Sequence, residues 1–273
     1  MMMKPLLQFG CAIAVLAAPA VAQDASGQMG LKSIDVLNGW YTENGTYMAA
    51  VRFSLEDGWK TYWRAPGKNG IPPSFDWEGS ENLSSVKFHW PAPKVYVQNG
   101  ISTLGYKGDF ILPIEVMPTV SGDPIKIKSQ IEYGICSDVC VPASSTLDAI
   151  MGKGPAQLDL IKTALAARPL SAEAAEVHTV SCQIEPNEDG MRITANITFN
   201  NTAPDIDMTV IEFAAPNIWI DQLDLEQSGN VITAQAELVS FTDTPLVMDQ
   251  GKLRVTLIGK KNAVEINGCP IAG

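Results

Sequence analysis

The sequence predicts an all-β protein with two antiparallel β-sandwich domains, joined by a short helical linker. Short alternating or β-branched runs, broken by Gly, Pro, Asn and Asp, fill residues 31–151 and return from residue 177 onwards. Helical periodicity is confined to one short segment between these two regions. Strand signals at this spacing, almost without helical periodicity, are typical of antiparallel sandwiches.

The amino terminus has the pattern of a secretory signal peptide over residues 1–22. Lys4 precedes an apolar stretch at 10–21, and the small residues Ala-Val-Ala stand at 20–22. The stretch is too short to span a bilayer, so we expect cleavage after Ala22, which would also remove Cys11. Export would place the mature chain in the periplasm, an oxidising compartment in which disulfides persist.

The mature chain divides by pattern into two domains and a linker. Residues 23–152 are expected to form the first sandwich, and residues 177–273 a second, smaller one. The linker, residues 153–176, contains a predicted helix with Pro155 as its first residue and Arg168-Pro169 as its stop signal. Apolar residues recur at helical spacing at Leu158, Ile161 and Leu165.

Composition excludes several classes of function. The 30 acidic residues outnumber the 19 basic ones, which argues against binding nucleic acid through its phosphates. No apolar run after the signal peptide approaches ~18 residues, so we expect no membrane-spanning segment in the mature chain. The two histidines, His89 and His178, are too few and too far apart for a zinc or acid–base site. We therefore predict no metal site and no cofactor.

Four cysteines remain, and the first two, Cys136 and Cys140, lie close together in the sequence. In an extended strand they would be about 13 Å apart, whereas a disulfide needs Cα atoms within roughly 7 Å, so the segment must turn. Residues 125–135 alternate like a strand, and Val141-Pro142 would end a helix quickly. We therefore predict a tight turn or hairpin end with one cysteine on each arm.

Such a turn lacks the helix dipole that lowers the thiol pKa in thioredoxin-type sites. The nearest charges in the sequence, Glu132 and Asp138, would raise the thiol pKa, so the pair is better suited to being attacked as a disulfide. By spacing alone the pair fits a small structural clip as well as a redox site. A third interpretation is Cu(I) bound by two thiolates and a methionine sulfur, although the methionines are scattered singly.

The other two cysteines, Cys182 and Cys269, stand near the two ends of the second domain. A disulfide between them would close a loop of about 88 residues and contribute roughly 4.6 kcal/mol on the chain-entropy model. The short loop between Cys136 and Cys140 would contribute only about 2 kcal/mol. We therefore expect Cys182 and Cys269 to form a structural disulfide.

Aromatic and proline blocks surround the first pair in a specific order. They are GWKTYWR at 58–64, APG at 65–67, GIPPSFDW at 70–77, WPAP at 90–93, GYKG at 105–108, LP at 112–113 and YGICSDVCVPA at 133–143. This set resembles the amino-terminal periplasmic domain of the DsbD thiol:disulfide interchange proteins, especially the branch of the copper-sensitivity suppressor protein ScsB. The resemblance covers residues 31–150, and the second domain is similar to the extra β domain of that branch.

The resemblance implies immunoglobulin-like sandwiches and a cysteine pair that cycles between dithiol and disulfide. Electrons would come from a membrane-embedded thiol reductant and pass to an oxidised periplasmic thioredoxin-like protein. By the same resemblance Cys140 forms the mixed disulfide with the acceptor and Cys136 resolves it. A cap loop that shields the cysteines would fall at Tyr96, Gln98 and Asn99, before Ser102.

Two departures from the family limit this transfer. Longer members continue into a membrane domain and a thioredoxin-like domain, for which this sequence shows no pattern. Either a separate membrane protein supplies the electrons, or the redox role has been lost. The cap loop does not reproduce the family's aromatic cap, for which Tyr96 would substitute. The leading hypothesis is a redox carrier, an enzyme only in that it exchanges disulfides with proteins. The alternatives are a Cu(I)-handling protein with a role in copper tolerance and a non-catalytic immunoglobulin-like binding module.

Overall fold

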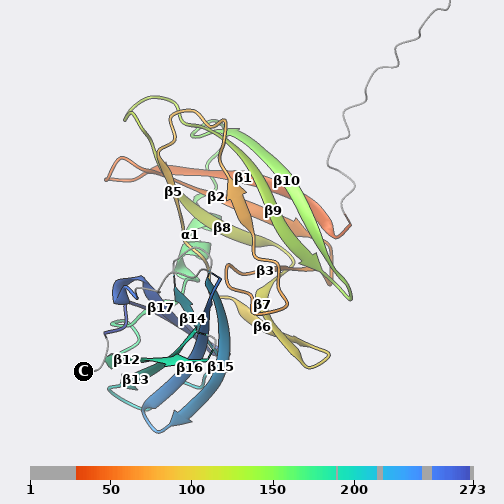
Figure 1. The fold of residues 1–273 in the computed structure, drawn as a ribbon. Coiled ribbons are helices and arrows are strands. Elements are labelled where there is room, and N and C mark those ends of the chain that lie inside the picture. Colours follow the sequence, from red (N-terminus) through yellow and green to blue (C-terminus); the bar gives the residue numbers. More distant parts are fainter. Residues whose placement is uncertain (1–28, 189, 214–217, 242–247, 271–273) are drawn as a thin grey trace, which may run out of the picture.

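The computed structural model describes residues 29–188, 190–213, 218–241 and 248–270. Within these ranges the chain folds into two β-sandwiches, which lie one above the other in Figure 1. The fold is all-β and immunoglobulin-like, as predicted, and its one α-helix among the described residues follows the first sandwich. The predicted signal peptide lies outside the described residues.

The first sandwich consists of two antiparallel sheets. One sheet has the order β1-β2-β8-β5. Its strands are β1 (Leu31–Tyr41), β2 (Tyr47–Leu55), β8 (Phe110–Met117) and β5 (Ser85–Phe88). The other sheet has the order β10-β9-β3-β7-β6, with β4 paired to β9. Its strands are β10 (Cys140–Ile150), β9 (Lys126–Cys136), β3 (Lys60–Tyr62), β7 (Ile101–Lys107), β6 (Lys94–Gln98) and β4 (Ser74–Asp76).

Strand β2 shows how the sequence builds the core of this sandwich. Because side chains alternate along a strand, one set of residues enters the space between the two sheets. That set is Tyr47, Ala49, Val51, Phe53 and Leu55. The other face of β2 is also apolar, and there Met48 and Ala50 pack with Leu37 and Ile161 of the helix. Burial on both faces explains why β2 reads as a nearly continuous apolar run.

The helix α1 (Leu158–Ala166) is docked on the first sandwich through its apolar face. It begins three residues later than the sequence predicts, because Ala156 pairs with Asn38 of β1 and Gln157 N–H donates to the Asn38 carbonyl at 2.8 Å. Pro155 therefore precedes the helix and is not its first residue. At the other end, the carbonyl of Ala167 accepts a hydrogen bond from Ala92 N–H at 2.8 Å.

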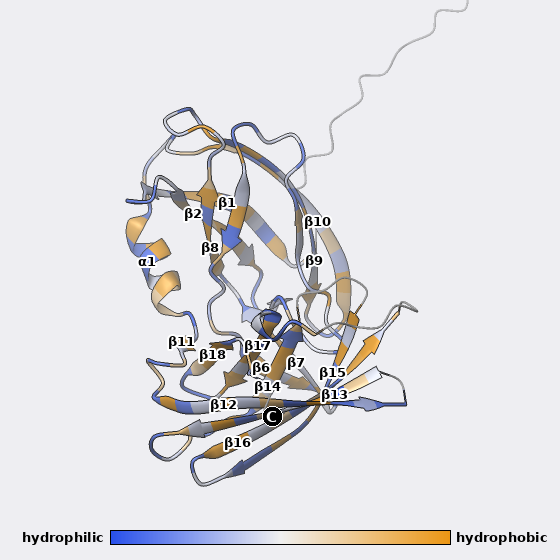
Figure 2. Cartoon of the chain, turned by 60° about the vertical axis from the view of Figure 1, so that its left-hand side comes forward, coloured by the Kyte–Doolittle hydropathy of each residue, from blue (hydrophilic) through white to orange (hydrophobic). Residues whose placement is uncertain are grey.

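The second sandwich has two four-stranded sheets. Their orders are β11-β18-β17-β14 and β12-β13-β16-β15, and among the strand pairs that the structure describes here β11–β18 alone is parallel. The strands are β11 (Leu170–Ser171), β12 (Val177–Asn187), β13 (Gly190–Phe199), β14 (Met208–Phe213), β15 (Ile218–Ser228), β16 (Val231–Ser240), β17 (Leu253–Ile258) and β18 (Ala263–Asn267), with a 3₁₀ turn at Gln250–Lys252. Hydrophobic and hydrophilic residues alternate along strands such as β13 and β16 (Figure 2). The segment 153–176 thus contributes α1 to one sandwich and β11 to the other.

An ion-pair cluster joins the two sandwiches. Arg64, just after β3, donates two hydrogen bonds to Glu212 of β14 at 3.0 and 2.8 Å and one to Glu265 of β18 at 2.8 Å. Its guanidinium also stacks 4.2 Å from the ring centroid of Trp63. Burial by itself would lower the pKa of Arg64. The carboxylates of Glu212 and Glu265 have the larger combined effect, so the pKa of Arg64 is raised above its usual value. The charged cluster therefore holds the segment after β3 against the second sandwich.

Candidate functional site

The first cysteine pair lies at the end of a β-hairpin. Cys136 is the last residue of β9, Cys140 is the first residue of β10, and the two are register partners. A disulfide joins them with their Cα atoms 4.1 Å apart. The hairpin predicted from the sequence, with one cysteine on each arm, is therefore confirmed.

The two cysteines differ in their exposure to solvent. Cys136 is 0% exposed, whereas Cys140 is an exposed residue. Val139, immediately before Cys140 in the turn, is 68% exposed. A second protein can therefore approach the disulfide from the Cys140 side, while Cys136 stays within the sheet.

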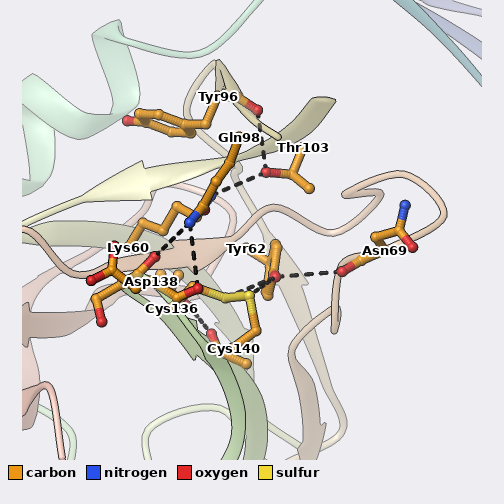
Figure 3. Close-up of a disulfide and its surroundings, with 12 residues drawn as sticks. Lys60, Tyr62, Asn69, Tyr96, Gln98, Thr103, Cys136, Asp138 and Cys140 are labelled. Atoms are coloured by element: carbon orange, nitrogen blue, oxygen red, sulfur yellow. Dashed lines mark hydrogen bonds between the residues drawn. A yellow bond between two sulfur atoms is a disulfide. The ribbon is translucent and has the colours of Figure 1, made fainter. Parts of the chain in front are cut away.

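Tyr62 places a hydroxyl group against both sulfurs (Figure 3). Its Oη lies 2.8 Å from Cys136 Sγ and 2.9 Å from Cys140 Sγ, and the side chain is 1% exposed. Burial raises the pKa of Tyr62, so the phenol keeps its proton and can donate it in a hydrogen bond to sulfur. No sequence pattern assigned this tyrosine a role at the cysteines, because the pairing of β3 with β9 is what brings it to the disulfide.

Lys60 brings a positive charge to the same site. It lies directly opposite Cys136 in the β3–β9 pair and is 6% exposed. Its Nζ donates to Thr103 Oγ1 at 3.4 Å and to Gln98 Oε1 at 3.5 Å. Burial lowers the pKa of Lys60, and the charge of Lys107 lowers it further. From the sequence we expected only acidic neighbours, Glu132 and Asp138, around the cysteines. That expectation is incomplete, because strand pairing also places Lys60 opposite Cys136.

The expected cap loop is a β-hairpin. Tyr96 and Gln98 belong to β6, and Asn99 and Gly100 form the turn to β7, with φ values of 53° and 77°. Positive φ at both positions is the conformation of a type I′ turn, which Asn-Gly favours. Asn99 therefore lies in the turn, while the Gln98 side chain points toward the disulfide turn (Figure 3).

Gln98 connects this hairpin to the turn between the cysteines. Its Nε2 donates to the carbonyls of Ser137 and Asp138, each at 3.4 Å. The ring of Tyr96 lies near two ammonium groups, with its centroid 5.6 Å from Lys60 Nζ and 5.2 Å from that of Lys107. The β6–β7 hairpin is therefore hydrogen-bonded to the turn between the cysteines. Cys140 remains exposed with the hairpin in this position.

The second disulfide has a different setting. Cys182 of β12 and Cys269, which follows β18, are joined with their Cα atoms 5.6 Å apart. The two residues are 0% and 1% exposed and pack within the apolar core of the second sandwich. Both cysteines are therefore buried, in contrast to exposed Cys140.

Neither a metal cluster nor a membrane span occurs in the described part of the chain. In these ranges no three His, Cys, Asp or Glu side chains are grouped as a metal ion would need. The helix found there is also too short to cross a bilayer.

Comparisons with known proteins agree with this geometry. The model of the family described as thiol:disulfide interchange protein DsbD, N-terminal, matches residues 22–151. The structure is similar to the crystal structure of the N-terminal periplasmic domain of ScsB from Proteus mirabilis, with a TM-score of 0.61 and 22% sequence identity. That likeness covers 88% of this chain and 92% of the other, and it shows a shared fold. No curated protein matches the sequence.

Proposed function

Because residues 22–151 belong to the family of DsbD amino-terminal domains, we propose that this chain exchanges thiols and disulfides in the periplasm through Cys136 and Cys140. It accepts electrons from a membrane-embedded thiol reductant and passes them to an oxidised thioredoxin-like protein. One observation carries this proposal. The disulfide joins one exposed and one buried cysteine, and a phenol hydroxyl lies within 2.9 Å of both sulfurs.

Exchange begins at the exposed sulfur. A thiolate of the reductant attacks Cys140 Sγ, which breaks the bond to Cys136 and releases Cys136 as a thiolate. The reductant's second thiolate then attacks the mixed disulfide, and the reductant leaves as a disulfide. Two electrons have entered the pair, and both cysteines are reduced.

Delivery to the acceptor reverses these steps. The Cys140 thiolate attacks the acceptor disulfide, and one acceptor sulfur leaves as a thiolate and takes up a proton. Cys136 then attacks Cys140 Sγ, which restores the disulfide and releases the second acceptor thiolate. The hydroxyl of Tyr62 can donate to whichever sulfur carries negative charge, since it lies within 2.9 Å of both.

Exposed apolar side chains support docking of a protein rather than a small thiol. Val139 in the turn between the cysteines is 68% exposed, and Val97 and Ile101, which flank the neighbouring Asn-Gly turn, are 69% and 44% exposed. The hydrogen bonds of Gln98 hold these two turns together. Exposed apolar side chains that gather in one place mark protein–protein interaction sites, whereas singly scattered ones do not.

A trapping experiment tests the proposal. Cys136→Ser leaves Cys140 free to form a mixed disulfide that cannot be resolved, and mass spectrometry identifies the captured protein. The matched control is Cys140→Ser, which keeps only the buried sulfur. We expect the first variant to capture a thioredoxin-like periplasmic protein and the control to capture far less. If Cys136→Ser captures nothing in cells that express the partner system, the proposal is wrong.

A further inference from the structure

A row of three side chains crosses the sheet at the disulfide. Lys60 of β3 is the register partner of Cys136 on one side and of Lys107 on the other. Residues directly opposite each other on neighbouring strands place their side chains on the same face, with Cβ atoms about 4.5–5.5 Å apart. Two lysines, buried Lys60 and exposed Lys107, therefore share one face of the sheet with buried Cys136, in a protein whose formal net charge is −11 at pH 7.

These cations have no carboxylate partner within the described ranges. None of the ion pairs found there includes Lys60 or Lys107, and the hydrogen-bond acceptors of Lys60 are a neutral amide and a hydroxyl. The other ionisable groups around the row are the phenols of Tyr62 and Tyr96 and the carboxylate of Asp138. Both phenols are neutral, and Asp138 is exposed in the hairpin turn. A buried ammonium held only by neutral groups is costly, and an adjacent anion would stabilise it.

Reduction of the disulfide supplies that anion. Opening the Cys136–Cys140 bond converts the neutral disulfide sulfur of Cys136 into a thiolate on the residue directly opposite Lys60 in the sheet. We propose that Lys60 is the counter-ion of the Cys136 thiolate, and that Lys107 adds to the positive potential at this sulfur. This inference rests on the proposed exchange at Cys140, because that reaction makes Cys136 the sulfur that leaves and later resolves.

The placement of the charge suits both halves of the cycle. When the reductant attacks Cys140, two electrons of the broken bond remain on Cys136, and Lys60 stabilises this leaving thiolate. When the acceptor is bound through Cys140, the same cation keeps Cys136 deprotonated for its attack on the mixed disulfide. Lys60 therefore makes up for the helix dipole that this hairpin site lacks.

The test is a thiol titration of the full chain with Cys140→Ser, in which the Cys182–Cys269 disulfide is left intact. The ultraviolet absorbance of the Cys136 thiolate is followed against pH in this parent and in three further variants. Lys60→Met removes the charge, Lys60→Arg retains it, and Lys128→Met removes an exposed lysine at the far end of β9 as the matched control.

We expect Lys60→Met to raise the thiol pKa by about one unit or more, which is a roughly tenfold loss of thiolate near neutral pH. Lys60→Arg and Lys128→Met should titrate within about half a unit of the parent. If Lys60→Met does not fold, Lys60→Gln replaces it and must give the same upward shift. A thiol pKa that stays unchanged in the uncharged variants overturns the inference.

The exchange function and the role of Lys60 can be refuted independently of each other. If the thiol pKa is unchanged without Lys60 and Cys136→Ser still captures a thioredoxin-like protein, only the role of Lys60 is wrong. If the pKa rises as expected but no partner is captured, Lys60 is the thiolate counter-ion and the exchange function is wrong.

Discussion

Replacing Tyr62 with Phe removes one hydroxyl from the disulfide and leaves the ring in place. The ring packs against Gly134, where an added Cβ would come within 2.7 Å of it, and Phe would preserve this contact. A hydrogen bond to a charged group contributes about 1.5–3 kcal/mol, and Tyr62 can donate such a bond to the leaving thiolate. At about 1.4 kcal/mol per factor of ten, the rate of disulfide opening should fall roughly tenfold to a hundredfold.

The assay is the rate at which reduced glutathione opens the Cys136–Cys140 disulfide, measured at one pH and ionic strength. Tyr106→Phe is the matched control, because its buried hydroxyl donates to the Pro91 carbonyl at 2.7 Å and touches neither sulfur. Each variant should lose only about 1 kcal/mol of unfolding free energy. Equal opening rates in Tyr62→Phe and the wild type would refute a role for the hydroxyl.

Three further predictions concern stability. Replacing both Cys182 and Cys269 with Ala should lower the unfolding free energy by about 2–5 kcal/mol in denaturant titrations. The Cys136–Cys140 pair should still exchange disulfides in this variant. An unchanged denaturant midpoint would contradict a structural role for the Cys182–Cys269 disulfide. Arg64→Met removes the cation that lies 2.8 Å from Glu212 and Glu265, and leaves each carboxylate with its 4.0 Å contact to Arg254. This change should cost about 2–3 kcal/mol, against about 0–1 kcal/mol for Arg192→Met at a more exposed ion pair. Equal losses would mean that the interdomain cluster contributes little. Burial lowers the pKa of His89 below its ordinary value of about 6.5, so on acidification the unfolded chain binds this proton before the folded chain does. The unfolding free energy should therefore fall as the pH drops from about 7. His89→Gln should show a smaller fall between about pH 7.5 and 5.5, and a fall identical to that of the wild type would contradict this.

Local patterns were enough to predict the fold class and the hairpin that carries the cysteines. The alternation of residues before Cys136 and the proline after Cys140 act within a few residues of the turn. The Asn99-Gly100 turn carried an equally local signal, which would have identified the expected cap loop as a hairpin.

The groups around the sulfurs could not be predicted in this way. Tyr62 and Lys60 reach the disulfide because β3 pairs with β9, and periodicity does not specify which distant strands become neighbours. The start of the helix was misplaced for the same reason, since the pairing of Ala156 with Asn38 keeps the chain extended beyond Pro155. Tertiary contacts decided each of these features.

The reduction potential of the Cys136–Cys140 couple tests the central claim most directly. It is measured by equilibrating the full chain with glutathione buffers and counting the thiols by alkylation and mass spectrometry. A couple that exchanges electrons with thioredoxin-like proteins should have a potential between about −120 and −270 mV. A potential below about −300 mV would mark the disulfide as a structural clip and contradict the exchange function.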